Sequence, residues 1–397
     1  MLIKAVTIIV TIIILILSYS VIQFSPQYML RILKYGESDV NDHKIFPSRV
    51  INKAEEPYFF EKKDTVDLNK LPIQYLYNNR DKSAKLDELL ERTGTTAFIV
   101  ISNDKIVYEK YFNGYKRDSV NTSFSAAKSF VSLLVGMAID DGYIDSVDEP
   151  ITNYISELTG TDFELITIED LLQMRSPISY KEGNLWFGDD AKTYYMPDLR
   201  GLAINNTRLT KKERDSFRYN NYHPLLLGII LERSTGETVA TYMEKKIWSR
   251  IGTEFDASWS LDSEKTGFEK MESGINARAI DFAKVGWLVL NNGIWQGEQI
   301  ISNEWLQQSF AKESLSFDEI NHSFIKNQNT GYGYMWYSIE DGQGNYDVYA
   351  LGKYGQLIYI SPTHQTVIIR NGKEYGAVDW WPDIFKTMIL AMNNSYE

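Results

Sequence analysis

The sequence predicts an α+β fold of the α/β-sandwich kind. Strands from both chain ends would build one antiparallel sheet flanked by helices, with a mainly helical subdomain inserted between them. Two strand-like runs, Ala97–Ile101 and Ile106–Phe112, enclose an Asn103-Asp104 turn and predict a hairpin. Residues 346–372 hold further strand-like runs separated by turns, and Asp379–Asn393 is expected to form a terminal helix. Helical patterns dominate the stretch between the two groups of strands.

The remaining elements follow in chain order. Residues 25–65 are expected to form an extended polar connector, because prolines and alternating charges oppose regular structure there. One domain then spans 66–397 and includes a helix over Lys82–Thr93, before the hairpin. Its helical subdomain is expected at about 142–224, and residues 225–250 continue as helix.

The N-terminus carries an uncharged apolar run. Residues 5–24 follow Lys4 without a charge, and a helix of that length spans roughly 30 Å, the thickness of a bilayer's hydrocarbon core. Residues 1–24 are therefore predicted to be a transmembrane anchor. The alternative is a cleaved signal segment with Ser18 and Ser20 as the small residues before the cut, which would give a secreted protein. Either way, the domain would be exported to a periplasmic or extracellular space.

Composition argues against several classes of function. The formal net charge of −12 opposes nucleic-acid binding, which favours a basic stripe. The chain has no cysteines, which excludes disulfides and thiol catalysis. Its four histidines lie far apart without metal-ligand spacing, and no metal or other cofactor is expected. The sequence also has no G-x-S-x-G elbow, so nothing supports a Ser-His-Asp triad. Composition leaves the oligomeric state unknown.

A serine and a lysine one helical turn apart open an apolar helix. The string SAAK at Ser125–Lys128 begins residues 125–141, where apolar side chains recur at helical spacing. Residues three apart share a helix face, so Lys128 can reach the Ser125 hydroxyl. The simpler interpretation is that Ser125 only caps the helix. The same spacing recurs in a hairpin turn and in polar stretches, beginning at Ser102, Ser309 and Ser323.

Two further strings could complete a catalytic group. They are YNN at Tyr219–Asn221 and KYG at Lys353–Gly355, which follow the serine in that order. Lys353 lies between strand-like runs, where a lysine at a strand edge could face the serine. Two rival strings have unsuitable surroundings. Lys265-Thr266-Gly267 lies in unpatterned polar sequence, and Tyr77-Asn78-Asn79 precedes the serine.

These residue types suit acyl transfer by a serine that has no histidine partner. A serine hydroxyl is a poor nucleophile until a neighbour takes its proton. Lys128 and Tyr219 would be those neighbours, and Lys128 and Lys353 on either side of the phenol would stabilise its phenolate. Asn221 would hold the Lys128 amine and a substrate amide.

Other residues would bind the substrate. The N–H groups of Ser125 and Gln356 would form an oxyanion hole, and Gly355 would let the strand backbone approach the substrate closely. Several aromatic side chains could line an apolar pocket, although ordinary packing explains any single one of them. They are Tyr180, Trp186, Phe187, Tyr194, Tyr195, Tyr332 and Trp336.

In this order the three strings resemble the serine β-lactamase and penicillin-binding-protein superfamily. The similarity is to its class C-like branch, which includes esterases and 6-aminohexanoate-dimer hydrolases. It runs from about Ala97 to the C-terminus and rests on the segments 123–144, 171–180, 217–237, 272–309 and 350–362. The resemblance implies a β-lactamase/transpeptidase-like fold. It implies Ser125 as the nucleophile, Lys128 as its partner and Tyr219 as the general base. It also implies Asn221 as a positioning residue and Lys353 as the strand lysine.

One departure shapes the expected activity. Class C β-lactamases grip the drug's carboxylate with small hydroxyl residues after the strand lysine, whereas this chain has Tyr354 and Gln356. The resemblance therefore implies a serine hydrolase that cleaves small ester, amide or peptide-like substrates through an acyl-enzyme. The alternative is a β-lactamase or D-Ala-D-Ala carboxypeptidase. A second alternative is a penicillin-binding-type receptor or scaffold without turnover.

Overall fold

The computed structural model describes most of the chain after residue 24. The described residues are 24–63, 68–70, 72–183, 185–210, 216–310, 315–316, 319, 329–340 and 344–394, with six isolated positions before residue 24. The predicted anchor or signal segment, residues 1–24, thus lies almost wholly outside them. Within the described part of the chain, no helix has both the length and the apolar character needed to cross a membrane.

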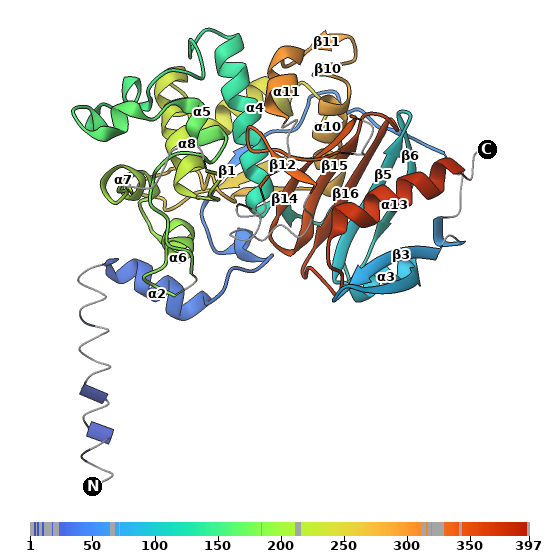
Figure 1. The fold of residues 1–397 in the computed structure, drawn as a ribbon, viewed down its shortest axis with the longest axis horizontal. Helices are drawn as coiled ribbons and strands as arrows, with labels where there is room; N and C mark the ends of the chain where they lie inside the picture. Colours follow the sequence, from blue (N-terminus) through green and yellow to red (C-terminus); the bar gives the residue numbers. More distant parts are fainter. Residues whose placement is uncertain are drawn as a thin grey trace.

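An eight-stranded sheet forms the centre of the domain (Figure 1). Its order is β12-β13-β14-β15-β16-β5-β6-β2, so C-terminal strands pair with the early hairpin, as predicted. Neighbouring strands are antiparallel except β2 and β6, which run parallel. The bounds are Glu61–Lys62 (β2), Thr95–Ser102 (β5), Lys105–Tyr111 (β6), Thr330–Tyr332 (β12), Tyr337–Glu340 (β13), Tyr346–Gly352 (β14), Gln356–Ser361 (β15) and Thr366–Gly372 (β16).

Helices cover both faces of this sheet. In Figure 1, α13 (Trp381–Asn394) lies across the near face, while α10 (Ala279–Leu290) lies behind and contacts β5, β15 and β16. The central strand β5 is buried over nearly its whole length, which explains its continuous apolar run. Between β5 and β6, Asn103 and Asp104 adopt left-handed φ values of 48° and 63°, as a two-residue hairpin turn requires.

The predicted helical region packs beside the sheet. Its helices are α4 (Ala127–Asp140), α5 (Ile168–Leu172), α6 (Asp189–Tyr195), α7 (Leu199–Asn205), α8 (Tyr222–Thr235) and α9 (Val239–Met243), with α11 (Asn303–Ser309) following later. Smaller sheets join β1 (Ser48–Ile51), β8 (Ala257–Ser260), β9 (Ile275–Ala277) and β7 (Asn121–Thr122), then β3 (Pro72–Tyr77) with β4 (Arg80–Lys85), and β10 (Ile294–Trp295) with β11 (Glu298–Gln299).

Two local predictions differ from the structure. The helix expected over Lys82–Thr93 is only α3 (Leu86–Arg92), because residues 80–85 pair with β3 as strand β4. The connector, expected to lack regular structure, contains the helix α2 (Pro26–Tyr35) and strand β1. Contacts with distant segments stabilise both elements: α2 packs against α6, and β1 pairs with β8.

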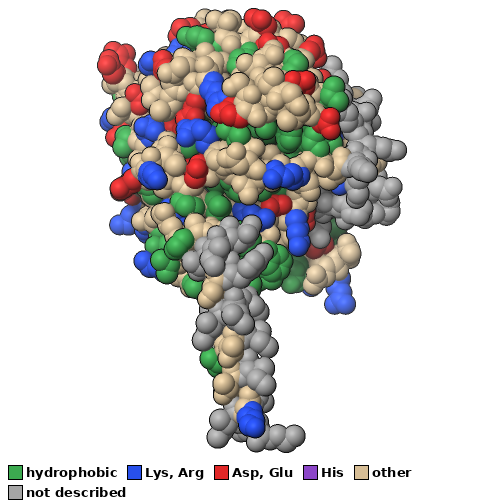
Figure 2. Space-filling view, turned by 90° about the vertical axis from the view of Figure 1, so that its left-hand side faces the viewer, with side chains coloured by type: hydrophobic (Ala, Val, Ile, Leu, Met, Phe, Trp, Pro, Cys, Tyr) green, Lys and Arg blue, Asp and Glu red, His purple; other side chains and the backbone are tan. Residues whose placement is uncertain are grey.

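Charged side chains of both signs are interspersed on the face shown in Figure 2. On the same face, hydrophobic side chains also show in the lower part of the domain in this view. The nearby helix α2 exposes Leu30 and Leu33 to solvent and buries Tyr28 and Met29. It is therefore amphipathic, with its buried side turned to the domain.

Candidate active site

Ser125 lies in a tight turn, Phe124–Ala126, that leads into α4. It is the one residue between 121 and 138 that is not buried. Phe124 has a left-handed φ of 44°, a costly conformation for a bulky side chain. The Ser123 hydroxyl donates to the Phe124 carbonyl at 3.1 Å and makes no helix-capping bond. The turn thus presents the Ser125 hydroxyl at the N-terminal end of α4, where the helix dipole favours negative charge.

Lys128 is buried against Ser125, with only 2% of its surface exposed. Its amine donates to Ser125 Oγ at 3.0 Å and to the Glu272 carbonyl oxygen at 3.0 Å. The same amine lies 4.8 Å from the centroid of the Tyr219 ring. The structure therefore brings the predicted nucleophile, lysine and tyrosine together. The second hydrogen bond of the lysine goes to the backbone of Glu272, where the sequence had suggested Asn221.

Tyr219 belongs to a group of phenols. Burial, with Tyr219 close by, raises the pKa of Tyr332 and of Tyr337 well above the ordinary value. Both side chains therefore stay protonated at neutral pH. Tyr219 is only partly buried and lines the cleft beside Ser125. Of these three phenols, Tyr219 is the one that lines the cleft.

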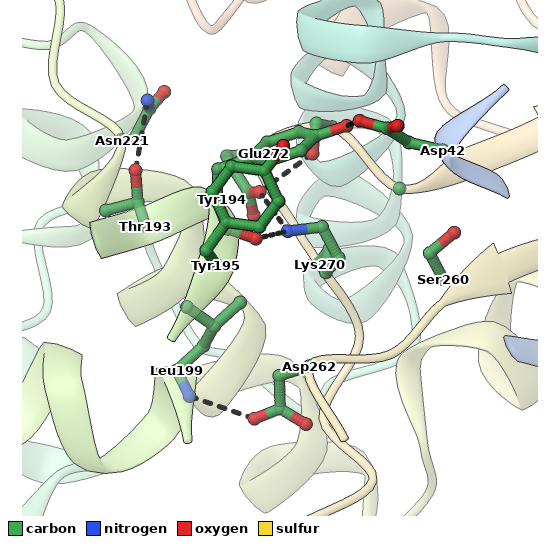
Figure 3. A network of polar contacts seen from close by, with 12 residues as sticks. Asp42, Thr193, Tyr194, Tyr195, Leu199, Asn221, Ser260, Asp262, Lys270 and Glu272 are labelled. Atoms are coloured by element: carbon green, nitrogen blue, oxygen red, sulfur yellow. Dashed lines mark hydrogen bonds and ion pairs between the residues drawn. The ribbon is translucent and has the colours of Figure 1, made fainter. Parts of the chain in front are cut away.

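Asn221 connects two parts of the cleft wall. Its amide nitrogen donates to the Tyr180 hydroxyl at 2.8 Å and to Thr193 Oγ1 at 3.3 Å; the bond to Thr193 appears in Figure 3. Tyr180 in turn donates to Asp190 at 2.6 Å. These bonds tie the loop before α6 to the start of α8. Asn221 thus orients the wall of the cleft through Tyr180 and lines the cleft itself.

Lys353 lies in the turn Lys353–Gly355 between β14 and β15, and it lines the same cleft as Ser125. Its amine donates to Glu37 Oε1 at 2.8 Å and to Ser38 Oγ at 2.9 Å. Both partners come from the connector, which the sequence analysis had not placed at the site. The sequence analysis had expected the Lys353 amine beside the Tyr219 phenol. In the structure, this amine donates hydrogen bonds to the connector.

Gly355 and Gln356 serve the turn itself. Gly355 has φ 73°, and a Cβ there would lie 2.4 Å from the Arg370 guanidinium. The packing of Arg370 therefore requires glycine whether or not a substrate approaches. The Gln356 side chain is buried and donates to the Gly372 carbonyl at 2.5 Å, while its Oε1 accepts from Asn371. Any role of Gln356 in substrate binding is left to its backbone N–H.

Two adjoining cavities meet at Ser125. The larger, of about 590 Å³, is lined by Ser125, Tyr180, Glu182, Asp190, Tyr219, Asn221, Leu351, Gly352, Lys353, Tyr354, Tyr375, Asp379 and Trp380. The smaller, of about 170 Å³, adds Gly36, Glu37, Ser38, Phe124, Ala191, Tyr194, Tyr195, Glu272 and Ser273. Among the described residues, no cluster of histidines or carboxylates could hold a metal ion.

The aromatic predictions separate into wall and core. Tyr180 lines the larger cavity, and Tyr194 and Tyr195 line the smaller. Tyr332 and Trp336 lie in the hydrophobic core. Trp186 packs against the cluster formed by α2 and α6, and Phe187 packs against its ring.

With this geometry in place, the comparisons with known proteins are decisive. The family model described as Beta-lactamase matches residues 83–374. The chain belongs to the beta-lactamase family. Within that family it is a serine hydrolase, as its named relatives are hydrolases of the same family.

Two curated relatives align with the chain. It is 27% identical over 320 residues to a 6-aminohexanoate-dimer hydrolase of Paenarthrobacter ureafaciens, covering 75% of this chain and 76% of the relative. It is 24% identical over 225 residues to a teichoic acid D-alanine hydrolase of Staphylococcus aureus (strain MRSA252), covering 53% of each.

Solved structures show the same fold. One from Bacillus anthracis, also named a 6-aminohexanoate-dimer hydrolase, has a TM-score of 0.72 at 24% identity, and the match covers 89% of this chain and 92% of that one. A class C β-lactamase has a TM-score of 0.59 at 14% identity, covering 77% of this chain and 93% of its own. At these identities the likeness concerns the fold, and it confirms the predicted β-lactamase/transpeptidase-like architecture.

Sequence reasoning missed the acidic side of the site. Asp190 could have been noticed, since Asp189 and Asp190 begin a helix beside a predicted aromatic pocket. Glu37 and Ser38 gave no signal, because they lie 316 and 315 positions from Lys353 in a segment expected to be extended. Glu272 contributes a backbone carbonyl, which no side-chain pattern reveals.

Proposed function

We propose that the protein hydrolyses small esters or amides through an acyl-enzyme on Ser125. The observation that carries this proposal is the position of the Lys128 amine. It lies 3.0 Å from Ser125 Oγ and 4.8 Å from the centre of the Tyr219 ring, and Ser125 and Tyr219 both line the larger cavity. A hydroxyl, an amine and a phenol in this arrangement can pass a proton among themselves, which a serine nucleophile needs.

The proposed reaction has two halves. Ser125 Oγ attacks the carbonyl carbon while its proton passes to the Lys128–Tyr219 pair, which then protonates the departing alcohol or amine. The backbone N–H groups of Ser125 and Gln356 stabilise the oxyanion. A water molecule then attacks the acyl-enzyme by the same proton route, and the acid product leaves.

The walls of the larger cavity favour the binding of a small, largely uncharged acyl group. Tyr180, Leu351, Tyr375 and Trp380 give the larger cavity aromatic and aliphatic walls. One relative is named for a 6-aminohexanoate dimer and another for D-alanine of teichoic acid. Both names support ester or amide bonds as the chemistry here. Export of the domain belongs to the proposal too, with residues 1–24 as a membrane anchor or cleaved signal, and rests on the uncharged run 5–24.

Substitution of the nucleophile tests the proposal. The purified protein should release nitrophenol from 4-nitrophenyl butyrate with an initial burst, and a fluorophosphonate probe should add one mass increment. Ser125→Ala should abolish both, because it removes the attacking oxygen. Ser102→Ala is the matched control, since Ser102 also precedes a lysine by three residues but lies at the β5–β6 hairpin turn. Full turnover by Ser125→Ala would disprove the proposal. If the wild type hydrolysed nitrocefin faster than 4-nitrophenyl butyrate, the β-lactamase alternative would be favoured.

A further inference from the structure

The connector forms part of the wall of the cleft beside Ser125. After α2 ends at Tyr35, residues 36–38 line the smaller cavity together with Ser125. Glu37 and Ser38 contact Lys353 on the sheet side, and Tyr354 also donates to the Ser38 carbonyl at 2.8 Å. We call residues 36–39 the strap. It connects α2, which packs against α6, to the β14–β15 turn.

Contacts on both sides hold the strap in place. On the N-terminal side, the Tyr28 hydroxyl donates to the Trp186 carbonyl at 2.7 Å, and Arg31 donates to the Tyr195 carbonyl at 3.0 Å. On the C-terminal side, Asp42 accepts from the Tyr194 hydroxyl at 2.8 Å, as Figure 3 shows. The Asp39 backbone N–H also donates to Asp42, at 2.9 Å. The position of the strap is therefore built into the fold, although Glu37 itself is mostly exposed.

The charges around the cleft give this contact a chemical consequence. Among the described residues that line the two cavities, Lys353 carries the only cationic side chain. The acidic residues that line them are Glu37, Glu182, Asp190, Glu272 and Asp379. With Glu37 bound to Lys353, that one cation is already neutralised. An anionic substrate group near Lys353 would meet these carboxylates, and the ammonium there is already paired with Glu37.

We propose that Glu37 is a specificity-determining residue that neutralises the Lys353 ammonium and so discriminates against substrates carrying a carboxylate near the scissile bond. The inference rests on the proposed function, since it concerns which esters or amides the same site accepts. Specificity of this kind arises from an unfavourable charge placed against the wrong ligand. The Ser38 hydroxyl supports Glu37 by accepting a second hydrogen bond from the same amine.

Matched pairs of chromogenic esters test the inference. 4-Nitrophenyl butyrate and 4-nitrophenyl hydrogen succinate differ by a carboxylate on the acyl side. 2-Nitrophenyl butyrate and 3-butanoyloxy-4-nitrobenzoate differ by a carboxylate on the leaving-group side. The measured quantity is the ratio of kcat/KM for the charged ester to that for its neutral partner. It is compared among the wild type, Glu37→Gln, Glu37→Ala and the control Glu55→Gln, which removes an exposed acid elsewhere in the connector.

In both Glu37 variants the ratio should rise at least about fivefold for one of the two pairs, because the freed ammonium can pair with the substrate carboxylate. The gain should shrink at 0.5 M salt, since the new ion pair is partly exposed. Glu55→Gln should keep the wild-type ratio. Unchanged ratios for both pairs in both Glu37 variants would overturn the inference, as would an equal rise in Glu55→Gln.

The outcomes separate this inference from the proposed function. Fluorophosphonate labelling and butyrate ester turnover by the wild type report the Ser125 chemistry alone. If these fail, the proposed function fails. If they succeed while the charge ratio does not respond to Glu37, only the specificity inference fails. Thermal unfolding of each variant checks that the exposed substitution leaves the fold intact.

Discussion

Lys128 reaches Ser125 across one helical turn, so local geometry alone explains that contact. The other partners at the site come from far along the chain. The Glu272 carbonyl that holds the lysine amine is 144 positions away from it. Sequence patterns could therefore predict the serine–lysine pair from its helical context. They could not predict the backbone carbonyl or the strap, since neither depends on a local pattern.

Replacing Tyr219 with phenylalanine separates the proposed proton transfer by its hydroxyl from the packing of its ring. In Tyr219→Phe the ring stays on the Lys128 amine, which keeps the cation–π contact seen at 4.8 Å. The proton-transfer group is lost, so kcat/KM for 4-nitrophenyl butyrate should fall by roughly 10²–10⁴. Stopped-flow acylation rates measure the effect.

Two comparisons guard this prediction. Tyr332→Phe removes a buried phenol of the same group and should cost far less activity, because that side chain is buried away from the cleft surface. If Tyr219→Phe acylates at the wild-type rate, Lys128 would have to act as the base without the phenol, and the assigned role would be wrong.

Among the elements, the contact between β14 and the turn before α4 determines how closely Lys353 and Ser125 approach each other. Gly352 ends β14 and pairs with Gln356 across the turn that carries Lys353. A Cβ on Gly352 would lie only 2.2 Å from the Ser123 carbonyl oxygen. The strand can therefore approach the serine turn only because this residue is glycine. The sequence analysis explained Gly355 by a substrate and overlooked Gly352, because both reasons lie in distant neighbours.

Gly352→Ala should separate the strand from the serine turn. We expect a loss of about 1–3 kcal/mol of unfolding free energy, together with a drop in ester turnover of at least about tenfold. Urea unfolding and nitrophenyl release measure the two effects. Gly297→Ala is the comparison, because its added methyl group meets nothing within 4 Å at a φ of 85° and reports backbone strain alone. Equal effects of the two substitutions on turnover would contradict the proposed contact.

Across the whole molecule, one buried histidine connects the core to pH. His223 of α8 is fully buried, and its Nε2 shares a hydrogen bond of 2.7 Å with the Ser176 hydroxyl. Burial lowers the pKa of His223 to about 3. The sequence analysis had found no metal-ligand spacing among the four histidines, and His223 is a core residue outside the cleft.

The sign of the pH dependence follows from proton uptake. An unfolded histidine binds a proton near pH 6.5, whereas His223 in the folded protein does so only near pH 3. Between these values the unfolded state binds more protons, so stability falls as the pH drops. This single group should remove about 3 kcal/mol between pH 7 and pH 4. Chemical denaturation at stepped pH values measures the slope.

A substitution isolates the histidine. His223→Gln removes the titrating ring, so its stability should decline less steeply than that of the wild type over the same pH range. His364→Gln, in the turn between β15 and β16, should keep most of the wild-type decline. Parallel curves for the wild type and His223→Gln would show that other groups cause the acid sensitivity.

The sequence by itself determined the sheet built from both chain ends, the apolar helix behind Ser125 and the order of the three catalytic strings. Each depends on periodicity or spacing that neighbouring residues carry. Only the tertiary structure decided the partners of Asn221 and Lys353, the glycine at 352 and the strap beside the cleft. Those features arise where segments from 28 to 316 positions apart pack together, and close packing depends on shapes and charges that no local pattern encodes.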